Sequence, residues 1–224
     1  MTILHIDIET IPSQLQWVKD GIKETIKPPG NIKKPESIDK WMKENAEQSA
    51  ENEWLKTSFN GAVGEIICIA WAFDDDPVQV IGRKLDEPES EMLGGFVGSV
   101  LFGANSKHSD LIKPITWCGH YITGFDLHFL WQRMIVNNKE MPVDIPHNVK
   151  PWGQGVFDTC HEWKGDTSGY GSLDAVAKIL GIEQTKTMSG ADVWPEIQAG
   201  NYEKVFDYCK SDVEIARQVY NRIK

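Results

Sequence analysis

The feature that most constrains this chain is a pair of carboxylates at the end of its first apolar run. Residues 2–8 are β-branched and apolar, which predicts a buried strand, and the run ends in Asp7-Ile8-Glu9. Because side chains alternate along a strand, Asp7 and Glu9 share one face. Two neighbouring carboxylates repel each other unless a cation lies between them or water solvates both. The pair alone is therefore compatible with an Mg²⁺ or Mn²⁺ site or with two solvated acids.

Two later acids lie in contexts that favour the cation site. Asp126 follows a predicted strand at 114–118 and begins a predicted helix, where aspartate is also a common N-cap. Tyr208 and Asp212 are four residues apart on the predicted helix 202–223, so both lie on one face. Alone, a tyrosine at this position is more often a core aromatic. The order of the motifs along the chain favours the metal site: two acids on a strand, an acid at the start of a helix, then a tyrosine and an acid on the last helix.

The remaining patterns predict an α/β fold. Strands precede helices that are interleaved with one more strand, which indicates a mixed sheet with helices on both faces. The segment 137–171 is predicted to be mostly loop, and the helix at 37–56 is expected to lie on the surface of the body. Further helices are predicted at 13–26, 89–102, 125–136 and 172–180, and a second strand at 64–73 with a hairpin partner at 78–81.

The composition predicts one domain over residues 1–224, with a polar helical insertion around 27–60. Of the 224 residues, 41% are hydrophobic and 25% are charged, which is typical of globular proteins. The net charge of −10 excludes a protein that holds nucleic acid through a strongly basic surface. It is compatible with one that meets phosphate through bound cations, because the clustered carboxylates then belong to the negative count.

Targeting signals and cysteine pairs are not apparent in the sequence. No apolar stretch approaches the roughly 20 residues of a membrane span. The acids at positions 7 and 9 come too early for a signal peptide, so we expect a cytoplasmic protein with no membrane partner. The four cysteines are isolated from one another, which predicts buried free thiols in a reducing compartment.

Three motifs together resemble the exonuclease motifs of the DEDD superfamily. They are Asp7-Ile8-Glu9-Thr10, the segment 119–126 that ends in Phe125-Asp126, and the segment 208–212. The tyrosine four residues before the last aspartate matches the tyrosine subclass, DEDDy. The chain resembles the proofreading domain of family B DNA polymerases and, still more closely, the stand-alone predicted exonucleases of phage and prophage genomes. The resemblance implies a ribonuclease H-like fold and a 3′–5′ exonuclease, in a bacterial host's cytoplasm if phage-encoded.

The resemblance also implies roles for individual residues. Two divalent ions, Mg²⁺ or Mn²⁺, would catalyse phosphodiester hydrolysis while Tyr208 positions the attacking water. The implied metal ligands are Asp7, Glu9, Asp126 and Asp212. The implied substrate-binding residues are Thr10, whose backbone would meet the terminal sugar hydroxyl, Tyr121 and Phe125. Tyr121 stands where the family B pattern usually has asparagine.

The expected substrate is the 3′ end of DNA, most readily single-stranded. Two alternatives stay open: a 3′–5′ exoribonuclease of the ribonuclease D type, which would differ in its contacts to the 2′-hydroxyl, and a non-catalytic nucleic-acid-binding relative. Protein partners are not indicated by any motif.

Several residues outside the motifs have two interpretations each. Asp158 is one more acid within possible reach of the metals, although helix capping is the more common role. Trp152 and Trp163 are either base-stacking residues or loop anchors. A cluster of lysines contacts a single-stranded backbone or belongs to a solvated loop; it consists of Lys27, Lys33 and Lys34.

Overall fold

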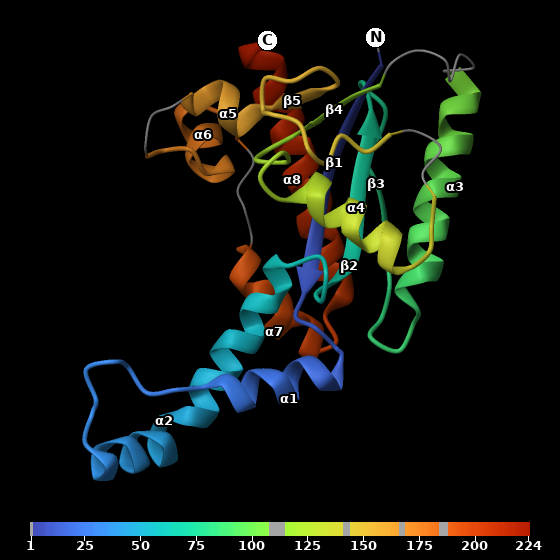
Figure 1. Cartoon of the computed structure of the whole chain (residues 1–224). Helices are drawn as coiled ribbons and strands as arrows, with labels where there is room; N and C mark the ends of the chain where they lie inside the picture. The colour runs from blue at the N-terminus through green and yellow to red at the C-terminus, as the bar shows by residue number, and fades with distance from the viewer. Residues whose placement is uncertain (1, 108–114, 141–143, 166–168, 184–187) are drawn as a thin grey trace.

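A five-stranded sheet with helices on both faces forms the body of the protein (Figure 1). The computed structural model describes residues 2–107, 115–140, 144–165, 169–183 and 188–224. The strands are β1 (Thr2–Ile11), β2 (Glu65–Phe73), β3 (Gln79–Gly82), β4 (Ile115–Gly119) and β5 (Val156–Asp158). The α-helices are α1 (Gln16–Thr25), α2 (Pro35–Leu55), α3 (Glu89–Lys107), α4 (Asp126–Val136), α5 (Thr159–Lys164), α6 (Leu173–Ile179), α7 (Val193–Gln198) and α8 (Tyr202–Ile223). The short 3₁₀ helices are η1 (Lys56–Phe59) and η2 (Gly190–Asp192).

The sheet is mixed, with β1 at its centre. The strand order is β3-β2-β1-β4-β5; β1 pairs antiparallel with β2 and parallel with β4. This confirms the predicted α/β class with a mixed sheet between two helical layers. β2 pairs with residues 4–11 of β1, whereas β4 pairs only with residues 2–5, so residues 7–10, at the carboxyl end, are held by β2.

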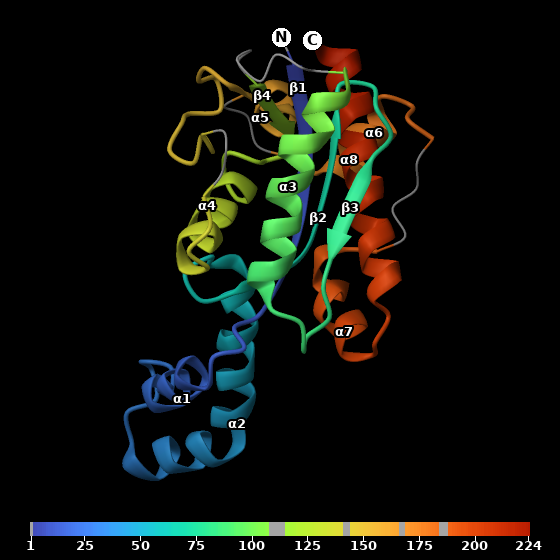
Figure 2. The same ribbon diagram turned by 90° about the vertical axis from the view of Figure 1, so that its right-hand side faces the viewer.

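The two faces of the sheet differ in the size of their side chains. On the face covered by α3 and α4, β2 contributes Ile69, Trp71 and Phe73 to a large core. On the opposite face it contributes the small Cys68, Ala70 and Ala72, which pack against α7 and α8. Figure 2 shows α3 and α4 on one side of β2 and α8 on the other. Small side chains allow α8 to approach the sheet closely, which brings its inward-facing residues next to β1.

Helices α1 and α2 form a hairpin arm that extends away from the sheet (Figures 1 and 2). Of the 21 residues of α2, only Ala50 and Trp54 are buried, so the expectation that this helix lies along the body is wrong. The other apolar side chains of the helix, such as Trp41 and Met42, are only partly buried, and most of the remaining residues are polar. Trp54 anchors the base of the arm: its indole N–H donates to Ser13 O at 2.7 Å, and its ring packs edge-on against Trp194. The arm overlaps the segment 27–60, whose assignment as an insertion stays a prediction.

Three further segments differ from the sequence-based expectation. The helix predicted at 89–102 continues to Lys107. The predicted loop at 137–171 contains β5 and α5, and the helices η2 and α7 were not predicted. These missed elements are three to six residues long, too short for a hydrophobic period to emerge. Parts of the predicted loop, residues 141–143 and 166–168, lie outside the described residues. Among the described residues, no helix combines the length and apolar character that a membrane span requires.

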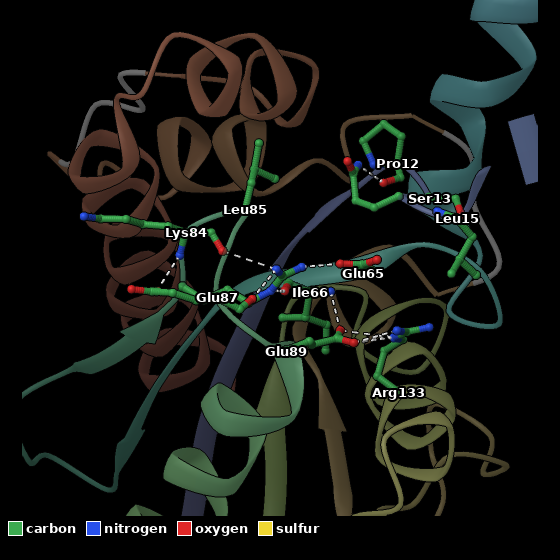
Figure 3. A network of polar contacts seen from close by, with 12 residues as sticks. Pro12, Ser13, Leu15, Glu65, Ile66, Lys84, Leu85, Glu87, Glu89 and Arg133 are labelled. Carbon is green, nitrogen blue, oxygen red and sulfur yellow. Dashed lines mark hydrogen bonds and ion pairs between the residues drawn. The ribbon is translucent and has the colours of Figure 1, made fainter.

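A buried ion pair connects α3 with α4 and is also hydrogen-bonded to β2 (Figure 3). Glu89, at the start of α3, accepts hydrogen bonds from Arg133 of α4, with Nε at 3.0 Å from Oε2. The other carboxylate oxygen accepts the Ile66 backbone N–H at 2.7 Å. Both side chains are about as buried as the core, at 5% and 6% exposed. Each charge is therefore satisfied by several partners, as a buried pair requires.

Arg133→Ala is expected to lower the free energy of unfolding by about 3 kcal/mol, because it leaves the Glu89 charge buried without its main partner. Urea denaturation measures this loss. Lys178→Ala breaks an exposed pair with Asp174 and serves as the control, with an expected change below about 1 kcal/mol. Equal losses in the two variants would contradict a structural role for the buried pair.

Candidate metal centre

Strand β1 presents two carboxylates to the face that α8 covers. Asp7 pairs with Ala70 and Glu9 with Cys68 on β2, so small side chains lie beside both acids. Ile8, between them, faces the opposite core. The strand alternation expected from the sequence is therefore observed, and both carboxylates point toward α8.

Helix α8 brings Tyr208 and Asp212 to the same place. Both side chains are on the buried face of the helix, at 4% and 5% exposed. The other buried residues of this 22-residue helix are apolar. Carboxylate oxygens of Asp7, Glu9 and Asp212 lie within 4.8 Å of one another. Cys209, next to Tyr208, places its sulfur 3.4 Å from an Asp7 carboxylate oxygen.

Asp126 approaches the cluster from the first turn of α4. Its Oδ1 accepts the backbone N–H of Ile8 at 3.1 Å, which ties α4 to β1 between the two strand acids. The side chain is 4% exposed. The structure thus brings together all four acids that the motifs single out, three of them as a close triad and Asp126 beside it.

Crowding of these carboxylates perturbs their protonation. Burial, followed by the charges of Asp126, Glu9 and Asp212, raises the pKa of Asp7 well above its usual range. Burial is also the main cause that raises the pKa of Asp126 to about 7. Burial and the neighbouring acids, including a hydrogen bond with Asp212, raise the pKa of Tyr208 above its ordinary value. The acids therefore repel one another, which a cation between them would relieve.

The donor set fits a hard divalent cation. It consists of carboxylate oxygens alone, which Mg²⁺ and Mn²⁺ prefer to sulfur or imidazole. The oxygens of Asp7, Glu9 and Asp212 are close enough to share one ion. Cys209 is not suited to join them, because burial and neighbouring acids raise the pKa of its thiol well above the usual range.

The predicted substrate residues have different environments. The Thr10 hydroxyl donates to Ser58 O at 2.8 Å, so the side chain links β1 to η1. Phe125 is half-buried and packs against Phe129, with ring centroids 5.4 Å apart. Tyr121 is 58% exposed and has a left-handed backbone conformation, with φ of 65°. Of the three, Tyr121 presents the most side-chain surface.

A groove of about 390 Å³ opens beside Thr10, between η1 and α7. Its walls include Leu55, Phe59 and Trp194. Phe59 is 74% exposed and its ring lies 6.3 Å from that of Phe125, which precedes Asp126 in the chain. Neither Phe59 nor Trp194 is singled out by a sequence motif. Phe59 is a lone aromatic in a polar stretch, and only the fold shows that its ring lies beside Phe125.

The other candidates lie in less informative positions. Asp158 caps α5, with its Oδ1 accepting the N–H groups of Cys160 and His161. Trp163 packs with α6 and α8 and is an anchor, whereas Trp152 is 63% exposed and lies against His161. The predicted lysine cluster belongs to the loop between α1 and α2, at the outer end of the arm (Figure 1). The four cysteines are buried and free, as predicted.

Comparison with known proteins identifies the family. No curated protein matches the chain significantly. The solved family B DNA polymerase from the hyperthermophilic archaeon Pyrobaculum calidifontis is similar over 99% of this chain, with a TM-score of 0.58 and 14% identity. The chain spans 24% of that polymerase's length, and the likeness establishes the fold alone, a ribonuclease H-like mixed α/β sheet.

Residues 52–224 match a family described as predicted 3′–5′ exonucleases related to the exonuclease domain of PolB. The match covers Asp126, Tyr208 and Asp212 but begins after β1. The structure connects the first motif with this region, because the carboxylates of Asp7 and Glu9 on β1 lie close to that of Asp212, which is within the match. The chain belongs to this family of predicted 3′–5′ exonucleases related to the PolB exonuclease domain.

Proposed function

We propose that this protein is a metal-dependent exonuclease that removes nucleotides one at a time from the 3′ end of single-stranded DNA. The family supplies the reaction class. The convergence of Asp7, Glu9 and Asp212 within 4.8 Å, with Asp126 hydrogen-bonded to the strand between the first two, supports a metal-dependent mechanism. A non-catalytic relative would have no physical reason to keep four acids, three of them buried, so close together.

In this proposal the four acids hold two Mg²⁺ or Mn²⁺ ions. When bound, such ions stabilise the attacking and leaving oxygens of an in-line displacement at phosphorus. Asp7, Glu9 and Asp212 would share one ion, and Asp126 would support the second. Four carboxylates together offset the charge of two divalent cations, so the loaded site accepts a phosphodiester anion.

Tyr208 would position the attacking water instead of taking its proton. Because its pKa is raised above the ordinary value, the phenol stays protonated at neutral pH. A protonated hydroxyl can hold a water molecule by hydrogen bonding but is a poor general base. The neighbouring Asp212 fixes the direction of the phenol through the hydrogen bond between the two side chains.

Unpaired bases would lie against the groove between η1 and α7. Its apolar walls and the exposed Phe59 ring suit a flat base, and stacking of this kind does not depend on base identity. A base inside a duplex is stacked between its neighbours, so it has no free face for such a contact. The groove therefore favours a single-stranded substrate, with its end near Thr10 and the acids.

The first test is cleavage of a 5′-labelled single-stranded oligonucleotide in Mg²⁺ or Mn²⁺. We expect a ladder that shortens from the 3′ end and is abolished by a chelator, by Asp7→Ala and by Asp212→Ala, because each variant removes a ligand of the shared ion. Asp174→Ala removes an exposed acid on α6 and is the matched control. Internal cuts, or full activity in both site variants, would contradict the proposal. A matched RNA strand tests the exoribonuclease alternative.

The metal-free protein is expected to lose stability as the pH rises from about 5 to about 8. The pKa values of Asp7 and Asp126 are raised in the folded state, so the folded chain binds more protons than the unfolded chain in this range, and stability falls with pH. Thermal unfolding measures this slope. Asp7→Asn is expected to flatten the slope and to raise the melting temperature at the upper pH, and Mg²⁺ is expected to do the same for the wild type. An unchanged slope in Asp7→Asn would contradict the crowding of charges.

Phe59→Ala is expected to weaken binding of single-stranded DNA by about 1 to 3 kcal/mol, roughly 5- to 150-fold, because it removes a stacking surface. The measurement is KM for a short oligonucleotide, with kcat expected to change little. Trp17 is also exposed, at 66%, but belongs to the arm, so Trp17→Ala is the control. Equal effects of the two substitutions would rule out a specific role for the groove.

A further inference from the structure

Asp158 makes more hydrogen bonds than a helix cap requires. It ends β5 beside Gly119 of β4 and is 1% exposed. Its Oδ1 accepts the N–H groups of Cys160 at 3.1 Å and His161 at 3.3 Å, which caps α5. For comparison, the cap of α6, Ser172, accepts a single N–H. The capping role accounts for only part of the Asp158 contacts.

The same carboxylate also binds the loop that leads from β4 to α4. Oδ1 accepts the Tyr121 N–H at 2.9 Å. Oδ2 accepts both the N–H and the hydroxyl of Thr123, at 3.1 and 2.6 Å. Among the described residues, Oδ2 accepts hydrogen bonds from this loop alone.

This loop has a conformation that needs support. Tyr121 has a φ of 65°, a left-handed conformation that costs a non-glycine residue about 1–3 kcal/mol. The Tyr121 ring covers Gly124 so closely that a Cβ at Gly124 would collide with it. The hydrogen bond from the Tyr121 N–H to Asp158 therefore holds the backbone of the strained residue.

The loop ends at Asp126, and its position sets where that acid lies. Leu127 N–H donates to Ile122 O at 3.1 Å, so the first turn of α4 is built on the loop. From that turn Asp126 reaches the Ile8 N–H on β1. A shift of the loop would move the start of α4 and, with it, the Asp126 carboxylate relative to Asp7.

We propose that Asp158 is a positioning residue of the nuclease site, which holds the loop of residues 120–125 so that Asp126 lies against β1. The inference rests on the proposed function. Asp158 itself binds no metal ion in this proposal, because its two oxygens are occupied by the N–H and O–H groups of the loop and of α5.

Asp158→Asn separates the two roles. Asparagine is as good an N-cap as aspartate, so α5 keeps its cap. The amide nitrogen that replaces Oδ2 is a donor and faces the Thr123 N–H, so the loop loses that hydrogen bond, while the remaining oxygen can still accept the Tyr121 N–H. Thr123→Val removes only the hydroxyl contact and should have a smaller effect in the same direction. Ser172→Ala removes the cap of α6 and is the structural control.

Mn²⁺ binding by calorimetry, amide exchange of residues 121–125, and kcat against KM are the measurements. Asp158→Asn is expected to weaken Mn²⁺ binding or lower kcat by about 10- to 100-fold, as is common for residues that orient metal ligands. The exchange of the loop amides should accelerate, and KM should stay within about threefold. Ser172→Ala should leave all three unchanged. In an Asp126→Asn background, adding Asp158→Asn should not weaken Mn²⁺ binding further, because Asp158 affects the ion only through the position of the Asp126 carboxylate.

The outcomes are distinct. If the wild type binds Mn²⁺ and cleaves DNA while Asp158→Asn behaves like Ser172→Ala, Asp158 is a cap only and the inference fails alone. Additive losses in the double variant would likewise overturn it, because Asp158 would then act by a route other than Asp126. A wild type that neither binds Mn²⁺ nor cleaves would overturn the proposed function together with the inference.

Discussion

Burial and mutual repulsion of carboxylates form the constraint on which this structure depends. Asp7, Glu9, Asp126 and Asp212 come from three separate elements, and burial together with the neighbouring negative charges raises the pKa of Asp7 and Asp126. Such an arrangement opposes folding, so the rest of the chain must supply the free energy that holds it. The acids are accordingly placed on well-packed parts of the fold, the central strand and the helices α4 and α8, which pack on opposite faces of the sheet.

The unequal faces of the sheet explain how one helix can complete the site. Trp71 and Phe73 fill the space under α3 and α4, whereas Ala70 and Ala72 leave room for α8 on the other side. Asp212 therefore reaches β1 directly. Asp126 comes from the opposite helical layer and reaches the same point only at the end of the strand, through the Ile8 N–H. The site lies where the two layers meet around the carboxyl end of β1.

The sequence predicted the convergence of the acids better than it predicted their surroundings. Strand alternation places Asp7 with Glu9, and helical spacing places Tyr208 with Asp212, because both depend on local geometry alone. The strand β5 and the helix α7 are too short to produce a hydrophobic period in the sequence, and their positions are set by partners far along the chain. The predicted position of the helix at 37–56 was wrong for a related reason. The burial of Trp54 depends on Ser13 and Trp194, which no local sequence pattern connects with it.

The charge of the protein bears on how it meets its substrate. A chain with a net charge of −10 repels a polyanion at long range, so affinity must come from contacts of short range. Two such contacts are adjacent in this fold: the proposed cations at the acid cluster and the apolar groove beside Thr10. Neither contact extends along the sugar-phosphate backbone of a nucleic acid, and the groove requires a base that is free to stack. In the proposed function both would therefore act on a few nucleotides at one place, which suits the recognition of a strand end better than the tracking of a duplex.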